Sequence, residues 1–211
     1  MAAIKLARVD ELPEGFLYRD GFLTEAEESE LLAIFRGLGF VAYDYHGYQA
    51  KRRIVRYGVN YDINTREEGE GVLPIPEFLI GIRSRAASFA GIAADELVQA
   101  MVSEYSVGTP IGWHRDAPQF GIIIGISLGS ACRMRLKAYA GHVSHASRQD
   151  AREVARATQS SVLSLRLEPR SIYVMRGPAR SEWQHSIPAV ERLRYSITFR
   201  SLRSSKTTRA A

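Results

Sequence analysis

Six short runs of β-forming residues follow one another from residue 98 onward, and they limit the possible folds more than any other feature of the chain. The runs cover residues 98–107, 121–128, 132–137, 162–167, 171–175 and 194–202, with turn-forming residues between them. Because few helical patterns separate them, they predict a β-sandwich or barrel rather than a parallel sheet. The exception is the polar stretch 141–161, whose 148–157 portion fits an exposed helix inserted between strands.

Two amphipathic helices are expected before these strands. Residues 24–27 form a capping box, and apolar residues keep helical spacing from Leu31 to Leu38. A second helix is expected from Pro76, an acceptable first-turn proline, to about Gly91. We expect the two helices to cover one face of a sheet.

Composition narrows the class of protein further. The 211 residues are 45% hydrophobic and include one cysteine, so we expect one domain without a disulfide framework, in a reducing compartment. The sequence has no long apolar run that suits a membrane span or signal peptide, and we expect a cytoplasmic protein without a membrane partner. The formal charge is +5, and the basic clusters at 51–56 and 192–209 suit a phosphate backbone. The alternative is that these basic clusters are only solvated surface. Residues 204–211 are expected to be a flexible tail.

Three residues are candidate metal ligands. His114 and Asp116 lie two positions apart at the end of an expected strand, where alternation points both side chains to the same face. His185 follows far downstream, and two imidazoles with one carboxylate form the facial triad that leaves positions open on non-haem Fe(II). A His-x-Asp pair alone is a weak signal, so a second observation is needed.

That observation is an arginine pair in the last expected strand. Arg194 and Arg200 lie six residues apart and therefore share a face with Ser196 and Thr198. Cations on the inner face of an apolar strand are costly unless they meet anions. A dicarboxylate that chelates iron through a 2-oxo acid end and meets Arg194 at its other end would be such an anion. The alternative is that the arginines pair with carboxylates of the chain itself, namely Glu168, Glu182 or Asp116.

These motifs together resemble the AlkB-like Fe(II)- and 2-oxoglutarate-dependent dioxygenases over about residues 50–203. The matching residues are a strand tyrosine, the His-x-Asp pair, a distal histidine and the closing arginines: Tyr105, His114, Asp116, His185, Arg194 and Arg200. The resemblance implies a mainly β fold with flanking helices, the double-stranded β-helix or jelly roll. It also implies one dioxygenase domain over residues 1–203, with the jelly-roll core at 98–203.

The resemblance assigns cofactors to individual residues. It implies that His114, Asp116 and His185 bind Fe(II), and that 2-oxoglutarate is the cosubstrate with molecular oxygen. The cosubstrate is expected to contact four residues: Tyr105, Arg194, Arg200 and Ser196. The sequence departs from many members at Glu104 and Ser196, where they have asparagine.

Residues 40–65 resemble the nucleotide-recognition lid of the same family, with a basic stretch that ends in Tyr57 and Gly58. Cations hold phosphates and aromatic rings stack on bases, and a base must leave the duplex before chemistry can reach it. We therefore predict that Arg53, Tyr57 and Trp113 bind substrate. The alternative is that the tyrosines pack on the helices while the basic residues are solvated.

The resemblance implies oxidative demethylation of alkylated DNA or RNA bases by a repair enzyme, and we expect a monomer. Hydroxylation of a base N-methyl group would release formaldehyde and the bare base, while 2-oxoglutarate gives succinate and carbon dioxide. Residues 117–119 read Ala-Pro-Gln where repair members often have acidic residues, so base selection is expected to differ. The alternatives are the same oxygenase chemistry on a protein or small molecule, and a non-catalytic jelly-roll protein that holds structural zinc. The sequence assigns no role to residues 138–161.

Overall fold

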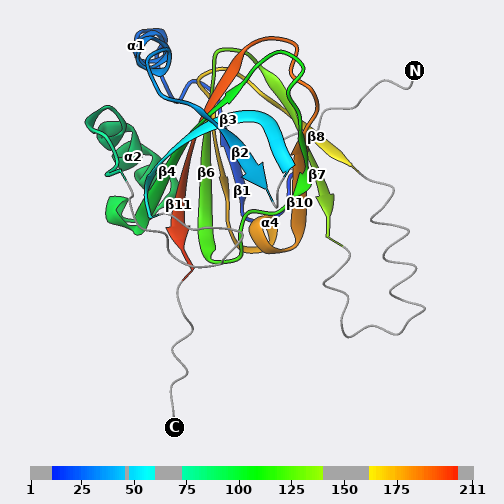
Figure 1. Ribbon diagram of the computed structural model, residues 1–211. Helices are drawn as coiled ribbons and strands as arrows, with labels where there is room; N and C mark the ends of the chain where they lie inside the picture. The colour runs from blue at the N-terminus through cyan, green and yellow to red at the C-terminus, as the bar shows by residue number, and fades with distance from the viewer. Residues whose placement is uncertain (1–10, 46–47, 60–72, 140–161, 204–211) are drawn as a thin grey trace, which may run out of the picture.

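Two β-sheets face each other, and two helices pack on the outside of the larger one (Figure 1). The computed structural model describes residues 11–45, 48–59, 73–139 and 162–203. The larger sheet has seven strands in the order β1 (Phe16–Arg19), β9 (Ile172–Met175), β6 (Phe120–Leu128), β11 (Arg194–Leu202), β4 (Leu97–Tyr105), β3 (Tyr48–Gly58) and β2 (Val41–Tyr45). The smaller sheet has four strands in the order β5 (Ile111–His114), β10 (Trp183–Ile187), β7 (Cys132–Ala138) and β8 (Leu163–Leu167). The neighbouring strands pair antiparallel, as a sandwich requires.

All six strands expected from residue 98 onward form, with ends displaced by two residues or fewer. The strand expected to end at His114 also forms, as β5, and the structure adds β10, which is short and carries polar residues. Strand β10 exists because it pairs with β5 on one side and β7 on the other, which is tertiary information. The helix expected at 148–157 and the tail at 204–211 lie outside the described residues.

Both expected helices are confirmed. Helix α1 (Glu25–Phe35) begins with the predicted capping box, in which Glu27 N donates to Thr24 Oγ1 at 3.2 Å and Thr24 N donates to Glu27 Oε2 at 2.8 Å. Helix α2 (Glu77–Ala90) follows Pro76 and ends at Gly91, whose φ of 69° suits a residue without a side chain. Two short helices complete the described part, η2 (Ala94–Glu96) and α4 (Gly177–Ser181). Within the described residues, no helix has the length and apolarity needed to cross a membrane.

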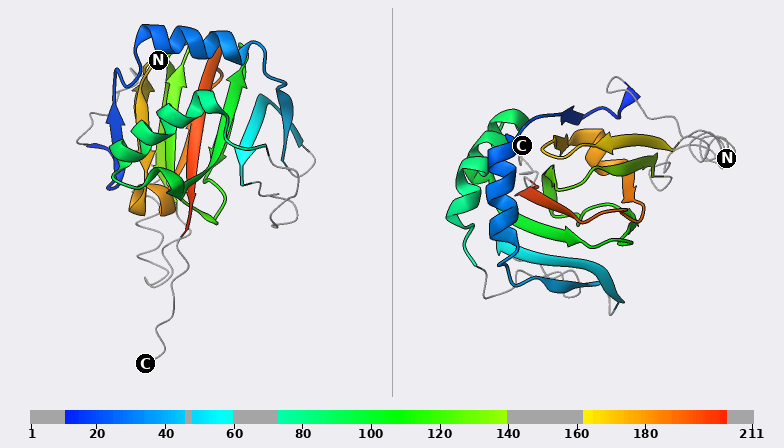
Figure 2. Two further views of the ribbon diagram at one scale, coloured as in Figure 1. Left: turned by 90° about the vertical axis from the view of Figure 1, so that its left-hand side faces the viewer. Right: turned by 90° about the horizontal axis from the view of Figure 1, so that it is seen from above.

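Strand alternation gives the large sheet two different faces. On β11, Tyr195, Ile197 and Phe199 belong to a core cluster that α1 and α2 cover (Figure 2). The intervening β11 residues, among them Arg194 and Arg200, point toward the four-stranded sheet instead. A second apolar cluster fills the space between the sheets, with contributions from β7 and β8. The interior therefore combines an apolar core with a row of buried polar side chains.

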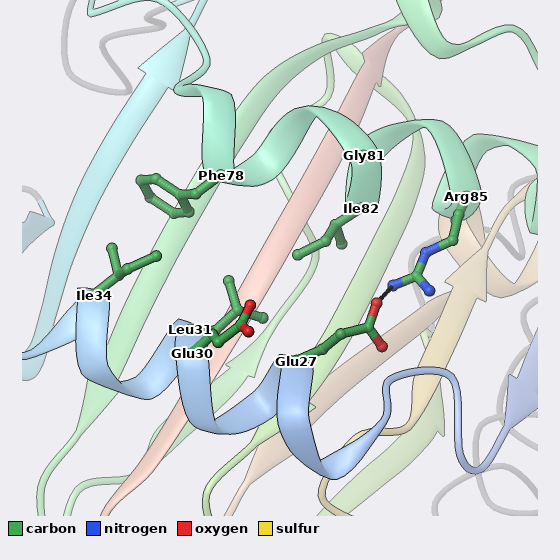
Figure 3. A pocket seen from close by; sticks show the side chains of 8 residues that line it. All are labelled: Glu27, Glu30, Leu31, Ile34, Phe78, Gly81, Ile82 and Arg85. Atoms are coloured by element: carbon green, nitrogen blue, oxygen red, sulfur yellow. Dashed lines mark ion pairs between the residues drawn. The ribbon is translucent and has the colours of Figure 1, made fainter.

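A groove of about 450 Å³ lies between α1 and α2 (Figure 3). Its apolar walls come from Leu31, Ile34, Phe78 and Ile82, and an ion pair of 2.6 Å joins Glu27 to Arg85 at one end. The groove lies on the helical side of the seven-stranded sheet. The candidate metal ligands lie on the other side of that sheet, so the groove is not the candidate active site.

Gly125 makes room for an aromatic ring between the sheets. It lies on β6 directly opposite Tyr173 of β9, and a Cβ atom at position 125 would collide with the Tyr173 ring. The ring also stacks on Phe16 at a centroid distance of 5.8 Å, so it has little freedom to move away. The pair Gly125 and Tyr173 thus acts as one packing unit.

We predict that Gly125→Ala lowers the free energy of unfolding by about 1–3 kcal/mol, because overpacking forces the ring to shift. The same substitution in a Tyr173→Ala background costs less, which gives a coupling energy above about 0.5 kcal/mol. Urea unfolding of the four proteins measures this cycle. Equal costs in both backgrounds would show that the Tyr173 ring is not the reason why position 125 requires glycine.

Candidate metal and cosubstrate site

The structure brings the three predicted metal ligands together. His114 ends β5 and pairs across the sheet with His185 of β10, with their ring centroids 4.1 Å apart. Between this pair and the pair of Ile111 with Ile187, two residues of β5 oppose one residue of β10, which is a β-bulge. Asp116 follows two residues after His114, and one ligand atom from each of the three residues lies within 4.8 Å of the other two.

Both histidines are prepared to act as neutral ligands. His114 Nδ1 donates to the Gly112 carbonyl at 2.9 Å, which leaves the Nε2 lone pair available. Burial lowers the pKa of His114. Burial and the facing His114 lower the pKa of His185 to about 3. Neither ring therefore has to lose a proton at neutral pH before it can bind a metal ion.

Asp116 is held in its ionised form by Arg200. Burial alone would raise the pKa of Asp116, but Arg200 and then the two histidines bring it well below its usual range. Arg200 Nε and Nη2 both donate to Asp116 Oδ1, at 3.1 and 2.9 Å. The other oxygen, Oδ2, lies 3.8 Å from His185 Nε2. Arg200 thus uses one carboxylate oxygen and leaves the second for a cation between the histidines.

Arg180 is a site residue that the sequence did not reveal. Its Nη2 donates to the carbonyl oxygens of Asp116, Ala117 and Phe120, at 3.1, 2.7 and 3.1 Å. Arg180 belongs to α4, and it anchors the loop that follows β5 and carries Asp116. No sequence signal links these positions, because their contact depends on how α4 docks in the folded chain.

The inner face beside the triad carries a cationic cluster around Arg194. Arg194 is 1% exposed, its Nε donates to Ser127 Oγ at 3.2 Å, and its guanidinium lies 4.8 Å from the centre of the Tyr105 ring. The Tyr105 hydroxyl forms hydrogen bonds with Arg52 and Ser196. Burial alone would raise the pKa of Tyr105, but the charges of Arg52 and Arg194 lower it below its ordinary value. An excess of positive charge therefore remains in this part of the interior.

Two buried polar atoms of this inner face lack hydrogen-bond partners within the described part of the chain. They are Arg194 Nη1 and Ser103 Oγ, and Ser103 lies opposite Ser196 in the sheet. A buried polar atom without a partner costs about 1–3 kcal/mol, so a group that completes these two atoms would be stabilised here. A carboxylate of a dicarboxylate cosubstrate fits this requirement.

The alternative that both arginines pair with the chain's own carboxylates is right for Arg200 only. Arg200 binds Asp116, and its Nη1 also donates to Gln99 Oε1 at 2.8 Å. Arg194 has no ion pair with any carboxylate in the described ranges. Its charge remains available for an external anion.

The three predicted substrate residues do not join the triad in this structure. Arg53 forms an ion pair of 2.6 Å with Glu104, and Tyr195 donates to the same carboxylate, on the helical face of the sheet. Tyr57 is 6% exposed and packs edge-on against Phe78 of α2. These contacts match the packing alternative for Tyr57, and the role of Arg53 and Tyr57 in substrate binding stays a prediction.

Trp113 lies on the outer face of the four-stranded sheet, beneath Arg135 and Lys137. Trp113 lies in the bulge of β5 and points outward, whereas His114 points inward. The role of Trp113 in substrate binding also stays a prediction. Arg52, the neighbour of Arg53 in the same basic cluster, is the cation that β3 contributes beside Tyr105.

The geometry can be compared with known proteins. A family model described as the 2OG-Fe(II) oxygenase superfamily matches residues 39–203. The chain belongs to the 2OG-Fe(II) oxygenase superfamily. This family uses Fe(II), 2-oxoglutarate and oxygen, which confirms the predicted enzyme class and cofactors, and the triad is a possible iron site.

One curated relative in this superfamily is an alkylated DNA repair protein ALKBH8 homolog from Arabidopsis thaliana. It is 32% identical over 187 residues, which cover 84% of this chain and 51% of the relative. The chain thus spans about half the length of that relative. The match confirms the predicted AlkB-like resemblance.

Two solved structures have the same fold as this oxygenase. The structure of OsALKBH1 has a TM-score of 0.64 at 16% identity, and covers 90% of this chain and 98% of its own. A Pseudomonas putida prolyl-4-hydroxylase has a TM-score of 0.59 at 12% identity, and covers 90% of this chain and 93% of its own. They confirm the predicted double-stranded β-helix.

Each part of the site has a distinct task in this oxygenase. Bound iron with 2-oxoglutarate and oxygen supplies the oxidation of a C–H bond. His114, Asp116 and His185 would hold the metal, and Arg194 with Ser103 would hold the far carboxylate of the cosubstrate. Arg200 keeps Asp116 ionised, while Arg180 fixes the backbone that carries it. The chain's own contribution is therefore position and charge.

We predict that Asp116→Ala weakens metal binding by more than about 100-fold, because it removes a ligand. Arg200→Met, which removes only the partner of Oδ1, weakens it by about 10–100-fold. Calorimetric titration with Mn(II), used in place of Fe(II), measures both. Asp95→Ala, which removes an exposed carboxylate from η2, is the matched control and should bind as the wild type. Unchanged affinity in Asp116→Ala would contradict the assignment of the triad.

We predict that Arg194→Met weakens 2-oxoglutarate binding to the Mn(II)-loaded protein by about 100-fold or more, since a buried carboxylate would lose its charged partner. Arg192→Met removes an exposed arginine two residues earlier and serves as the control. Calorimetry of the metal-loaded proteins compares the two. Retained affinity in Arg194→Met, together with retained metal binding, would mean that the cosubstrate lies elsewhere.

Proposed function

We propose that this chain is a dioxygenase that removes N-methyl groups from alkylated bases of DNA or RNA. The observation that carries the proposal is the 32% identity, over 84% of the chain, with a protein described as an alkylated DNA repair homolog. The likeness to OsALKBH1 supports the scaffold of such an enzyme, and its low sequence identity limits that support to the fold.

The electrostatics of the site support a polyanionic substrate. The chain has a formal charge of +5, and Arg52 lies beside Tyr105 on the inner face. Strand β3, which carries Arg52, pairs directly with β4 and lies within the region predicted to form the lid. Cations next to an oxidising site position a nucleic acid through its phosphates while the base enters the pocket.

The proposed reaction balances without a further reagent. One oxygen atom of O₂ enters the methyl C–H bond to give an N-hydroxymethyl group, and the other enters succinate as 2-oxoglutarate loses carbon dioxide. The N–CH₂OH group then breaks at its C–N bond, the nitrogen takes the hydroxyl proton, and formaldehyde leaves. The products are the unmethylated base, formaldehyde, succinate and carbon dioxide.

The test is incubation of the Fe(II)-loaded protein with 2-oxoglutarate, oxygen and single-stranded DNA or RNA that carries N-methylated bases. We predict loss of base methyl groups with one formaldehyde and one succinate formed per event, measured by mass spectrometry of the digested nucleosides. Asp116→Ala and an unmethylated oligonucleotide are the controls. Succinate formation without methyl loss from any oligonucleotide would contradict the proposal and favour a protein or small-molecule substrate.

A further inference from the structure

The outer face of the four-stranded sheet carries a row of cations that the metal site does not use. Along β7, Cys132, Met134 and Leu136 are buried in the inter-sheet core. The side chains between them point to the opposite face because strand residues alternate, and they are Arg133, Arg135 and Lys137. Arg166 of β8 lies directly opposite Arg133 and extends the row to the next strand.

Most of this charge has no acidic partner. Within the described residues, Arg133, Arg135 and Lys137 form no ion pair with a carboxylate, while Arg166 is paired with Glu168. Alternate residues of one strand lie about 6.6 Å apart, so the three β7 cations span about 13 Å. Cations held in such a row on a rigid sheet match a linear polyanion better than a single anion.

Aromatic rings are interleaved with these cations. The Trp113 ring lies 5.0 Å from the Arg135 guanidinium and 4.5 Å from the Lys137 ammonium nitrogen. Next to it, the Arg115 guanidinium lies 3.9 Å from the Tyr139 ring. Cation–π contacts fix the directions of these side chains before any ligand arrives. Arg135 is fixed further because its Nε donates to Ser186 Oγ at 3.0 Å.

The row begins at the metal site itself. Trp113 and Arg115 flank the ligand His114 in the sequence, and the β5 bulge turns Trp113 outward while His114 points inward. Helices α1 and α2 lie on the seven-stranded sheet, on the other side of the molecule (Figure 1). A nucleic-acid strand that crosses the outer face of β7 can therefore be the same strand that presents a base to the metal.

We propose that this face, named the β7 face and made of Trp113, Arg133, Arg135, Lys137 and Arg166, binds the phosphodiester backbone of the nucleic acid whose base enters the active site. The inference rests on the proposed function, and it assigns the partner of a surface outside the catalytic pocket. A row of cations beside an aromatic ring suits a nucleic-acid strand, because cations hold its phosphates and a ring can stack on a base. Backbone contacts of this kind carry no sequence preference.

The experiment is a fluorescence-anisotropy titration of the full chain with a labelled, unmethylated single-stranded oligonucleotide over a range of salt concentrations. The double variant Arg133→Gln/Lys137→Gln is expected to bind about tenfold more weakly at low salt. The slope of log affinity against log salt is expected to become shallower by about 1.4, at about 0.7 per lost phosphate contact. Arg133→Lys/Lys137→Arg keeps both charges and should retain affinity and slope.

A matched double variant, Arg36→Gln/Arg85→Gln, removes the same charge from the helical side and should bind as the wild type. Wild-type affinity and slope in Arg133→Gln/Lys137→Gln would overturn the proposal. Competition by an oligoglutamate peptide as strong as that by the unlabelled oligonucleotide would also overturn it, in favour of an acidic protein partner.

The binding assay needs neither methylated bases nor turnover, so the two proposals fail separately. Methyl removal by the wild type without a binding defect in the double variant counts against the β7 face alone. Charge-dependent binding without methyl removal counts against the proposed reaction alone.

Discussion

The position of the whole site depends on the alternation of side chains along β11. This strand lies inside the seven-stranded sheet and pairs with β4 on one side and β6 on the other. Its aromatic and apolar residues bury against α1 and α2, and Phe35 of α1 lies 5.5 Å from the Tyr195 ring. A slip of one residue would turn the arginines toward the helices and the aromatic rings toward the metal. Helix packing on one face therefore fixes the direction of the charged side chains on the other.

Among the buried charges of the described residues, Asp116 and Arg200 complete each other, whereas Arg194 and Arg180 each keep one nitrogen without a hydrogen-bond partner. Burying an ion costs several kcal/mol unless other groups compensate it, and Asp116 with Arg200 meets that condition through two hydrogen bonds to one oxygen. Arg194 is as deeply buried but has an unpaired nitrogen. A guanidinium held ready in this way does not need to reorganise when a carboxylate arrives, which favours binding. The same unpaired charge would disfavour the binding of a neutral molecule beside Arg194.

Much of the fold, the His114 and Asp116 pair and the arginine pair could be predicted because their signals are local, whereas His185 lies far downstream and is assigned together with the family pattern. The capping box of α1, the apolar spacing of α2 and the β-forming runs each lie within about a dozen residues, and Arg194 and Arg200 share one strand. The contact of Arg180 with the Asp116 loop and the ring of Tyr173 over Gly125 join positions about 50 to 64 residues apart. Strand β10 is short and polar, so pairing rather than propensity creates it. Features of this kind depend on the completed sandwich.

The basic stretch of β3 shows why composition does not reveal its phase, that is, which of its side chains face which side of the sheet. Arginines or lysines occupy positions 51, 52, 53 and 56, so both faces of the strand carry cations and neither phase is preferred. The phase is set by Tyr57, which packs on Phe78, and by the pairing of Arg53 with Glu104. Alternation then places Arg52 and Arg56 on the face that Tyr105 and Met101 share with Arg200. The charge that β3 offers to the inner face therefore comes from these two arginines, and Arg52 is the one beside Tyr105, while Arg53 secures the strand to the helical side.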